Sequence, residues 1–209
     1  MTVIICAFVF EEVVDDIFSD PKIGDPETLV FDNTVLQKLR DIRTEHLSQS
    51  MIDITALGSF SVITLMTVVL IIFLVIEKDW RGLGYIVLIT CGGSLIPVIL
   101  KNFFQRERPD ISGHLALVKS SSFPSGHSFG ATIAYFGLAF LLAREVKVIK
   151  IEILYYLLAI IVVGLVGTSR MYLGVHYPTD VVGGISCGLI WFSLVSMPYV
   201  YYSKDREVS

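Results

Sequence analysis

Charged side chains are scarce in this sequence. Asp, Glu, Lys and Arg make up 17% of the 209 residues, 54% are hydrophobic, and the mean hydropathy is +0.70. Soluble globular domains carry about 25% charged residues, so the composition argues against that class. Basic residues are too few for a nucleic-acid-binding face, because 16 Lys and Arg stand against 20 Asp and Glu, for a net charge of −4.

Cysteine is almost absent. Cys6, Cys91 and Cys187 lie singly in apolar segments, and the sequence contains no CxxC pair. The paired thiols that would indicate a zinc or redox site are therefore missing, and we interpret the three residues as small packing side chains. Internal repeats and low-complexity tracts are also missing, and the length corresponds to one domain.

Long runs without charge take up most of the chain instead. A helix that crosses about 30 Å of hydrocarbon needs roughly 20 apolar residues. Five runs approach that length, the two shortest only if their polar first turns are helical: 54–76, 82–100, 128–143, 153–169 and 181–203. We therefore predict an all-α, multi-pass membrane helix bundle with five spans.

The N-terminal segment does not complete a sixth span. Residues 2–10 are apolar, but Glu11 and Glu12 follow directly, and nine residues cannot cross the bilayer. No basic region precedes this run and no small-residue cleavage site follows it, so a signal peptide is a poor interpretation. We expect a short helix that inserts only partly, or one whose true start lies upstream.

An acidic, amphipathic segment follows the first helix. Residues 11–53 hold 11 acidic and 4 basic side chains, a balance of −7. The stretch LVFDNTVLQKLRDIRTEHL is amphipathic, and we expect it to lie along the membrane interface as a helix. The expected organisation is a short helix and interfacial segment over 1–53, a membrane-embedded core over 54–203 and a polar tail over 204–209.

Five spans that alternate in direction sort the connections onto two faces. The short loops 77–81 and 144–152 share one face with the C-terminal tail, and the polar loops 101–124 and 170–180 meet on the other. Short basic loops favour the first face as cytoplasmic. Seven Lys and Arg lie on the first face and nine on the other. The rule therefore favours the first face as cytoplasmic only if the cations needed for chemistry are left out of the count. We expect the polar loops on the extracytoplasmic side.

Three polar blocks interrupt the apolar chain on that face: KNFFQRERP from residue 101, PSGH from 124 and SRMYLGVHYPTD from 169. A lone Lys or Arg near the end of a span is usually a snorkelling anchor. Here the cations of these blocks and two histidines converge beside two helix starts. That concentration of positive charge predicts an anion-binding site.

The two helix starts carry suitable side chains. Pro124 ends the loop, Ser125 can cap the following helix, and Gly126 lets backbone approach a ligand, so free N–H groups can bind an anion. Asp180 lies four residues beyond His176, within reach of its ring. A carboxylate bonded to Nδ1–H would fix the tautomer and leave Nε2 as a nucleophile. An ordinary helix cap and a carboxylate beside a helix dipole are the alternative interpretations.

Two other chemistries are weaker. Two imidazoles and a carboxylate could bind a metal, but the neighbouring cations would repel it. Ser125 could act as a nucleophile, but the GxSxG elbow is absent and no strand precedes it.

The three blocks resemble the signature of the type 2 phosphatidic acid phosphatase (PAP2) superfamily: KxxxxxxRP, PSGH and SRxxxxxHxxxD. All eleven specified residues occur in order across residues 101–180. The five spans are similar to the family's membrane core, which usually has six helices. The short first helix is a departure from that pattern.

The resemblance implies a role for each site residue. His176 attacks phosphorus and becomes a phosphohistidine, with Asp180 orienting it, and His127 protonates the leaving oxygen and then activates water. The phosphoryl oxygens are held by Lys101, Arg108, Arg170, Ser125 and the amide of Gly126. Because the cations are side chains, neither a metal nor another cofactor is required.

These observations predict a membrane lipid phosphatase in the cytoplasmic membrane of a prokaryote. The resemblance implies a substrate like those of the family: phosphatidate, phosphatidylglycerophosphate, or a polyprenyl phosphate or diphosphate. A lipid phosphotransferase and a non-catalytic lipid-binding or transport subunit are the alternatives. Five spans argue against the superfamily's soluble haloperoxidases. The expected partners are the bilayer and the lipid, with no nucleic acid, and a homodimer is left open.

Overall fold

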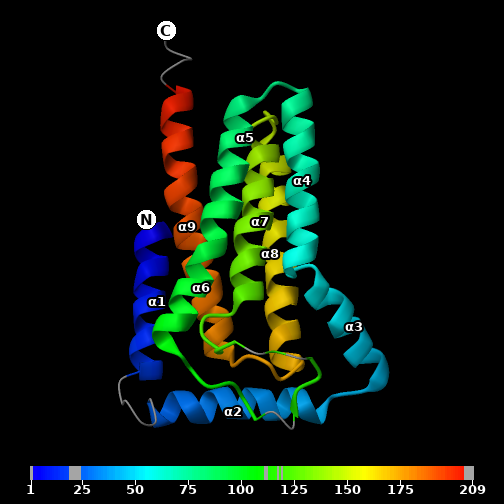
Figure 1. Cartoon of the computed structure of the whole chain (residues 1–209), viewed down its shortest axis with the longest axis vertical. Helices are drawn as coiled ribbons and strands as arrows, with labels where there is room; N and C mark the ends of the chain where they lie inside the picture. The colour runs from blue at the N-terminus through cyan, green and yellow to red at the C-terminus, as the bar shows by residue number, and fades with distance from the viewer. Residues whose placement is uncertain (1, 19–24, 111–112, 117, 119, 205–209) are drawn as a thin grey trace.

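The computed structural model describes residues 2–18, 25–110, 113–116, 118 and 120–204, and every regular element within them is helical. Long helices stand side by side and form the bundle in Figure 1. They are α4 (Phe60–Ile76), α5 (Trp80–Val87) continuing through the π-helical η1 (Leu88–Gly92) into α6 (Gly93–Phe104), α7 (Gly126–Ala143), α8 (Ile149–Tyr172) and α9 (Pro178–Lys204). The predicted all-α class is confirmed.

Four continuous helices are long and apolar enough to cross a membrane: Trp80–Phe104, Gly126–Ala143, Ile149–Tyr172 and Pro178–Tyr199. The short apolar runs at 128–143 and 153–169 do extend through their polar first turns. The fifth candidate span is the pair formed by α3 (Glu45–Ala56) and α4, whose axes differ by 41°. The chain is therefore a multi-pass membrane protein.

The expectation of one continuous span over 54–76 is wrong. Ile54 to Ala56 belong to α3, and α4 begins after Ser59, whose side chain accepts from the backbone N of Val62. Gly58 lies at the break, where a Cβ would meet Val166 Cγ1 at 2.6 Å and the His127 carbonyl oxygen at 3.0 Å. The bend therefore depends on a residue without a side chain, against which α7 and α8 pack closely.

The N-terminal region forms two further helices, α1 (Thr2–Phe18) and α2 (Pro26–Asp41). α1 runs beside the lower half of α9 (Figure 1). Asp25 caps α2 and Pro26 opens it, a combination that favours a helix start. α2 lies across the end of the bundle, with Val30 and Phe31 exposed. The amphipathic stretch is helical as expected, but it divides at Ile42–Thr44 into α2 and α3 rather than forming one helix.

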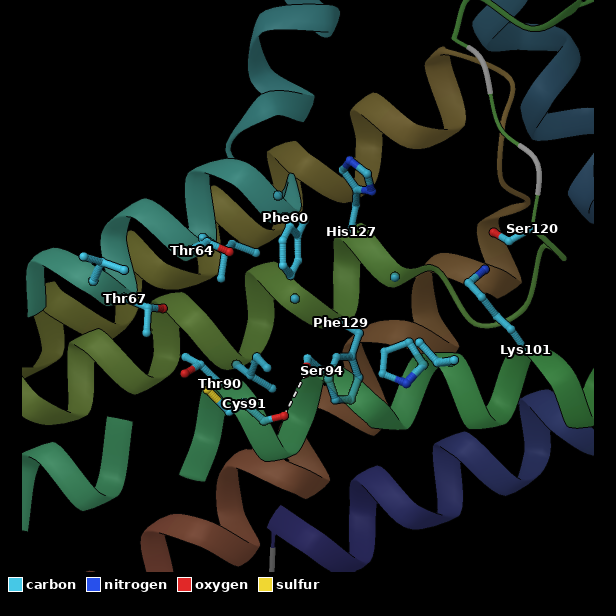
Figure 2. A pocket seen from close by; sticks show the side chains of 18 of the residues that line it. Phe60, Thr64, Thr67, Thr90, Cys91, Ser94, Lys101, Ser120, His127 and Phe129 are labelled. Atoms are coloured by element: carbon cyan, nitrogen blue, oxygen red, sulfur yellow. Dashed lines mark hydrogen bonds between the residues drawn. The ribbon is translucent and has the colours of Figure 1, made fainter. Parts of the chain in front are cut away.

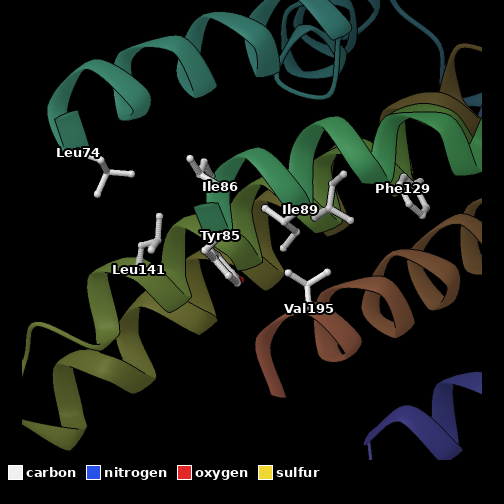
Figure 3. Packing of buried hydrophobic residues seen from close by; sticks show 8 residues of the cluster. Leu74, Tyr85, Ile86, Ile89, Phe129, Leu141 and Val195 are labelled. Carbon is white, nitrogen blue, oxygen red and sulfur yellow. The ribbon is translucent and has the colours of Figure 1, made fainter. Parts of the chain in front are cut away.

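Aromatic and branched side chains fill the centre of the bundle (Figure 3). Tyr85, Ile86 and Ile89 pack against Phe129, with Leu74, Leu141 and Val195 around them. The indole of Trp191 donates to the Ile89 carbonyl at 3.0 Å, within the π-helical turn, where backbone pairing departs from the α pattern. In a bilayer such packing stabilises through van der Waals contact and satisfied polar groups.

Small residues bring α9 onto α7. A Cβ at Gly184 would meet the Ser125 carbonyl oxygen at 2.6 Å, and one at Gly188 would meet Thr132 Cβ at 2.8 Å. Side chains at these positions would separate the helices, so the GxxxG spacing of Gly184 and Gly188 serves helix packing. This contact brings the N-terminal ends of α7 and α9 together.

The two-face arrangement of the connections is confirmed. The segment after α6 and the turn between α8 and α9 meet at the end of the bundle that α2 crosses. The connections after α4 and α7 lie at the opposite end, where Arg144 pairs with Asp79. Cys6, Cys91 and Cys187 are free thiols, of which Cys6 is buried, Cys187 half-buried and Cys91 exposed.

Candidate active site

All eight predicted site residues lie at the α2 end of the bundle, and four helix ends and two connections position them. Lys101 is in the last turn of α6, and Arg170 is in the last turn of α8. The others follow in chain order: Arg108 in the connection after α6, Ser125, Gly126 and His127 at the start of α7, His176 in the turn before α9, and Asp180 in its first turn.

His176 and Asp180 form a buried pair. The ring Nδ1 lies 3.4 Å from Asp180 Oδ2, and the two side chains are 3% and 0% exposed. The same oxygen accepts from the backbone N of Tyr177 at 2.9 Å and from the Ser122 hydroxyl. Three donors on one oxygen favour the ionised carboxylate. Because that oxygen accepts, Nδ1 carries the proton and Nε2 keeps its lone pair.

Burial keeps His176 neutral. It lowers the pKa of the imidazole to about 3, although Asp180 opposes the shift, and Arg108 adds to it. Nε2 lies 3.4 Å from the Arg108 guanidinium. A neutral ring whose free nitrogen faces a cation is suited to attack an anionic group bound to that cation.

Backbone carbonyls of the connection before α7 hold two of the cations. Lys101 Nζ donates to the carbonyls of Ser121 and Ser122, at 2.5 and 3.1 Å. Arg108 donates to the Ser120 carbonyl at 2.7 Å and to that of Ser121 at 3.3 Å. Burial lowers the pKa of Arg108, and the nearby Asp180 opposes the shift. Neutral carbonyl oxygens therefore hold both cations in place without cancelling their positive charge.

Arg170 is more deeply buried. The residue is 4% exposed, one Nη donates to the Thr55 hydroxyl at 3.0 Å, and its buried Nε has no hydrogen-bond partner in the structure. Within the described part of the chain, no ion pair involves Arg170, Lys101 or Arg108. Arg170 is buried and Lys101 and Arg108 are half-buried, so a cluster of cations without a direct ion pair favours the binding of an anion.

The start of α7 faces the same cations. Ser125 is the N-cap, and its hydroxyl accepts from the backbone N and the hydroxyl of Ser128, at 3.4 and 2.9 Å. Its own backbone N donates to the Asp180 carbonyl at 2.9 Å, which joins the two helix starts. Beside Gly126 the space is open as far as Lys101 Cε, 3.9 Å from where a Cβ would lie. His127 follows within electrostatic range of Arg170, Lys101 and Arg108.

A cavity of about 690 Å³ begins at Lys101, Gly126 and His127 and leads into the bundle. Lys101, Ser120 and His127 line one end, and the cavity continues between α4, α6 and α7 (Figure 2). Its inner walls are mostly apolar, with Ile63, Val68, Ile71, Val98 and Ile133 among the lining side chains. An anion-binding end and an apolar length match an amphiphile with a charged head and a hydrocarbon chain.

The sequence profile of the PAP2 superfamily matches residues 82–204, which is more than half of the chain and contains every one of these site residues. The chain belongs to the PAP2 superfamily.

Two similar proteins are phosphatases by name. Phosphatidylglycerophosphatase B of Bacillus subtilis is 38% identical over 156 residues, covering 74% of this chain and 76% of that protein. Lipid A 1-phosphatase of Rhizobium johnstonii is 33% identical over 132 residues, and the match spans about half of that protein, 47%, and 56% of this chain.

A solved structure supports the same relationship. A transmembrane PAP2-type phosphatidylglycerolphosphate phosphatase from Bacillus subtilis matches with a TM-score of 0.84 and 30% identity, over 100% of this chain and 98% of that one. The PAP2 resemblance inferred from three short blocks is thus confirmed over the whole chain.

Three residues of the candidate site were not assigned from the sequence. Arg106 donates to Asp180 Oδ1 at 2.6 Å, Ser122 donates to the other oxygen, and Asp32 binds Arg106. Arg106 was visible as a cation in the first block, but the pattern gave it no partner. Asp32 carried no local signal, because Thr179, which it also contacts, is 147 positions away.

The weaker chemistries find no support in the geometry. Among the described residues, no group of three or more His, Cys, Asp and Glu could hold a metal ion. Ser125 is fully buried and bonded to Ser128 rather than to a histidine. Outside this site, His114 is half-buried, with its ring Nε2 3.0 Å from the Pro109 carbonyl oxygen.

Proposed function

We propose that this membrane lipid phosphatase acts through a phosphohistidine formed on His176. The observation that carries the proposal is the geometry of the His176 ring, whose Nδ1 lies against Asp180 and whose Nε2 faces Arg108, one of three cations that form no ion pair among the described residues. In the first step, Nε2 attacks phosphorus and the bond to the lipid oxygen breaks. In the second step, water attacks the phosphohistidine, and inorganic phosphate leaves His176 free again.

Lys101, Arg108 and Arg170 bind the phosphoryl oxygens in this proposal. Phosphoryl transfer depends on positioning and fixed positive charge, and these side chains are fixed by carbonyl and hydroxyl acceptors. The α7 N-terminus, with Ser125 and the amide of Gly126, adds helix-end N–H donors. The partnerless Nε of Arg170 is a donor available to such an oxygen.

His127 is the proposed general acid, and afterwards the general base. It lines the cavity end together with Lys101, where the lipid oxygen would leave. A bound phosphate offsets the positive charge of Arg170, Lys101 and Arg108, so that the ring can carry a proton, which it gives to that oxygen in the first step. The neutral ring then accepts a proton from the attacking water, which restores the initial state.

The proposed substrate class is a phosphomonoester or diphosphate of a lipid. The apolar cavity supports a hydrocarbon chain next to the phosphate. Phosphatidylglycerophosphate is favoured by the names of the similar Bacillus subtilis proteins, with phosphatidate and polyprenyl phosphates or diphosphates as further candidates.

The membrane arrangement is also a proposal. Residues 54–203 are the catalytic core, 1–53 an interfacial attachment and 204–209 a polar tail. The active site faces the extracytoplasmic side of a prokaryotic cytoplasmic membrane. Support comes from basic residues at the end opposite the site: Lys78, Arg81, Arg144, Lys147 and Lys150.

Phosphate release from a small lipid panel tests the function. The purified protein is assayed in detergent with EDTA present, and His176→Ala is the matched variant. We expect metal-independent release of inorganic phosphate by the wild type and none by His176→Ala. Loss of activity in EDTA that Mg²⁺ or Zn²⁺ restores would contradict the mechanism. Transfer of phosphate to another acceptor without free phosphate would identify a phosphotransferase instead.

A further inference from the structure

A second carboxylate is buried behind Asp180. Asp32 is 0% exposed, although it belongs to the interfacial helix α2, whose other acidic residues, Glu27 and Asp41, are exposed. An ionised carboxylate is costly to bury unless donors surround it. Its contacts therefore indicate what the side chain does.

Asp32 contacts the first turn of α9 and the connection after α6. Oδ1 accepts from the backbone N of Thr179 at 3.2 Å, and Oδ2 accepts from the Thr179 hydroxyl at 2.6 Å and from Arg106 Nη2 at 2.8 Å. The contact with the backbone resembles an N-cap supplied by another helix. A cap alone does not require the guanidinium.

Arg106 bridges two carboxylates. Nη2 binds Asp32, and Nη1 donates to Asp180 Oδ1 at 2.6 Å, on the side of the carboxylate away from His176. The guanidinium also lies over the Tyr177 ring, 4.4 Å from its centroid. Because both Nη atoms of the planar guanidinium are hydrogen-bonded, the guanidinium fixes the rotation of the Asp180 carboxylate and hence the direction of Oδ2.

We infer that Asp32 is a positioning residue for the phosphatase reaction, acting through Arg106 on Asp180 and thereby on the ring of His176. The inference rests on the proposed role of His176. Asp32 orients the guanidinium and offsets its charge, so that Asp180 remains an effective counter-ion for the cationic phosphohistidine. α2 thus contributes to the active site without touching the substrate.

The ionisation of the two residues is mutually dependent. Burial raises the pKa of Asp32, and the donors Thr179 and Arg106 oppose that rise. Burial lowers the pKa of Arg106, but Asp180 and Asp32 together raise it above its usual value. Removal of Arg106 would therefore favour the neutral form of Asp32, whereas Arg106 stays charged and would lose only the partner that holds its Nη2.

Kinetics of purified variants on phosphatidate in detergent micelles test this inference. Asp32→Asn keeps the shape of the side chain and removes its charge. We expect kcat to fall about tenfold to a hundredfold, because a hydrogen bond to a charged group is lost, while KM stays within about twofold. Asp32→Glu should recover part of kcat. Asp41→Asn, on the exposed face of α2, is the matched control and should behave as the wild type.

A double variant separates positioning from helix capping. If Asp32 acts through Arg106, Asp32→Asn combined with Arg106→Gln should be no slower than Arg106→Gln alone. Multiplied losses, or an Asp32→Asn enzyme with lower thermal stability but full kcat, would overturn the inference and leave only a cap.

Two further measurements keep the test decisive. Should Asp32→Asn not be recovered as monodisperse protein, Arg106→Lys replaces it, because lysine keeps the charge but cannot donate in parallel to both carboxylates. Unchanged kcat in Arg106→Lys would overturn the inference.

The proposed function fails separately, if His176→Ala retains turnover. With His176→Ala inactive and Asp32→Asn at full kcat, only the positioning role fails.

Discussion

At the scale of single residues, the two histidines of the site differ in their surroundings. His176 is buried and paired with Asp180, whereas His127 is half-buried and lines the cavity end among cations. A buried, oriented imidazole suits a nucleophile, and a ring next to the leaving oxygen suits proton transfer. The two residues should therefore fail at different steps when they are replaced.

His176→Ala should abolish turnover and form no phosphoenzyme. With an aryl phosphate, whose leaving group needs little protonation, His127→Ala should still be phosphorylated, but hydrolysis should slow about 10²–10⁴-fold because the base for water is lost. Rapid quench with labelled substrate measures both steps. Label trapped on His176→Ala protein, or rapid hydrolysis by His127→Ala, would contradict the assignment.

Residues of the site differed in how readily the sequence revealed them. The predicted residues lie in three short blocks, where fixed spacing places them at helix ends, so local pattern was sufficient to bring them together at one end of the bundle. Asp32 lies outside those blocks, and only the folded position of α2 brings it to Arg106. The carbonyls that hold Lys101 and Arg108 were equally invisible, because backbone groups carry no sequence signal.

At the scale of elements, the contact between α7 and α9 sets the position of Ser125. Gly184→Ala would place a Cβ 2.6 Å from the Ser125 carbonyl oxygen, and backbone must move to accommodate it. We expect a loss of about 1–3 kcal/mol of stability together with reduced kcat.

Gly164→Ala on α8 is the matched control, because a Cβ there meets nothing within 4 Å. Thermal unfolding in detergent and phosphate release measure the two effects. Equal melting temperature and equal phosphate release in the two variants would show that α7 and α9 tolerate separation.

The wall of the cavity offers a second test at this scale. Thr64 lines the cavity from α4, and its neighbour Leu65 is 66% exposed and does not line it. Thr64→Trp should raise KM for a long-chain lipid phosphate but not for a water-soluble aryl phosphate. Leu65→Trp should change neither value. If both variants bind long-chain substrate as the wild type does, the hydrocarbon chain lies elsewhere.

Predicting elements from apolar runs succeeded where a run is continuous and failed where it bends. The run 54–76 contains no charge, yet it is divided at Gly58 and Ser59. The helix breaks there because α7 and α8 pack closely against Gly58. The division of the amphipathic stretch at Ile42–Thr44 has a similar origin. Arg43 donates from that break to the carbonyls of Tyr172 and Gly113, contacts that depend on tertiary structure.

At the scale of the whole molecule, the buried state of His176 links stability to pH. Its pKa is about 3 in the folded protein against an ordinary 6.5. The ring of the unfolded chain takes up a proton as pH falls through 6.5, and the folded ring does not. The stability gained from a neutral ring is therefore present above pH 6.5 and lost progressively as pH falls toward 3.

We expect the melting temperature of the wild type to fall relative to that of His176→Gln between pH 7 and pH 4, because glutamine does not titrate. Thermal unfolding of both proteins in the same detergent measures the difference. A difference that stays constant over this range would mean that His176 protonates with its ordinary pKa in the folded protein.

The cavity has a consequence for how the reaction proceeds in a membrane. Its polar end carries Lys101 and His127 at the α2 end of the bundle, while its apolar length continues between the helices. The dephosphorylated lipid partitions into the bilayer and inorganic phosphate into water, so the products leave in different phases. The substrate concentration that the enzyme meets is then the mole fraction of lipid phosphate in the membrane surface. Adding inert lipid should therefore slow the enzyme by dilution in two dimensions, even when the bulk concentration of substrate is constant.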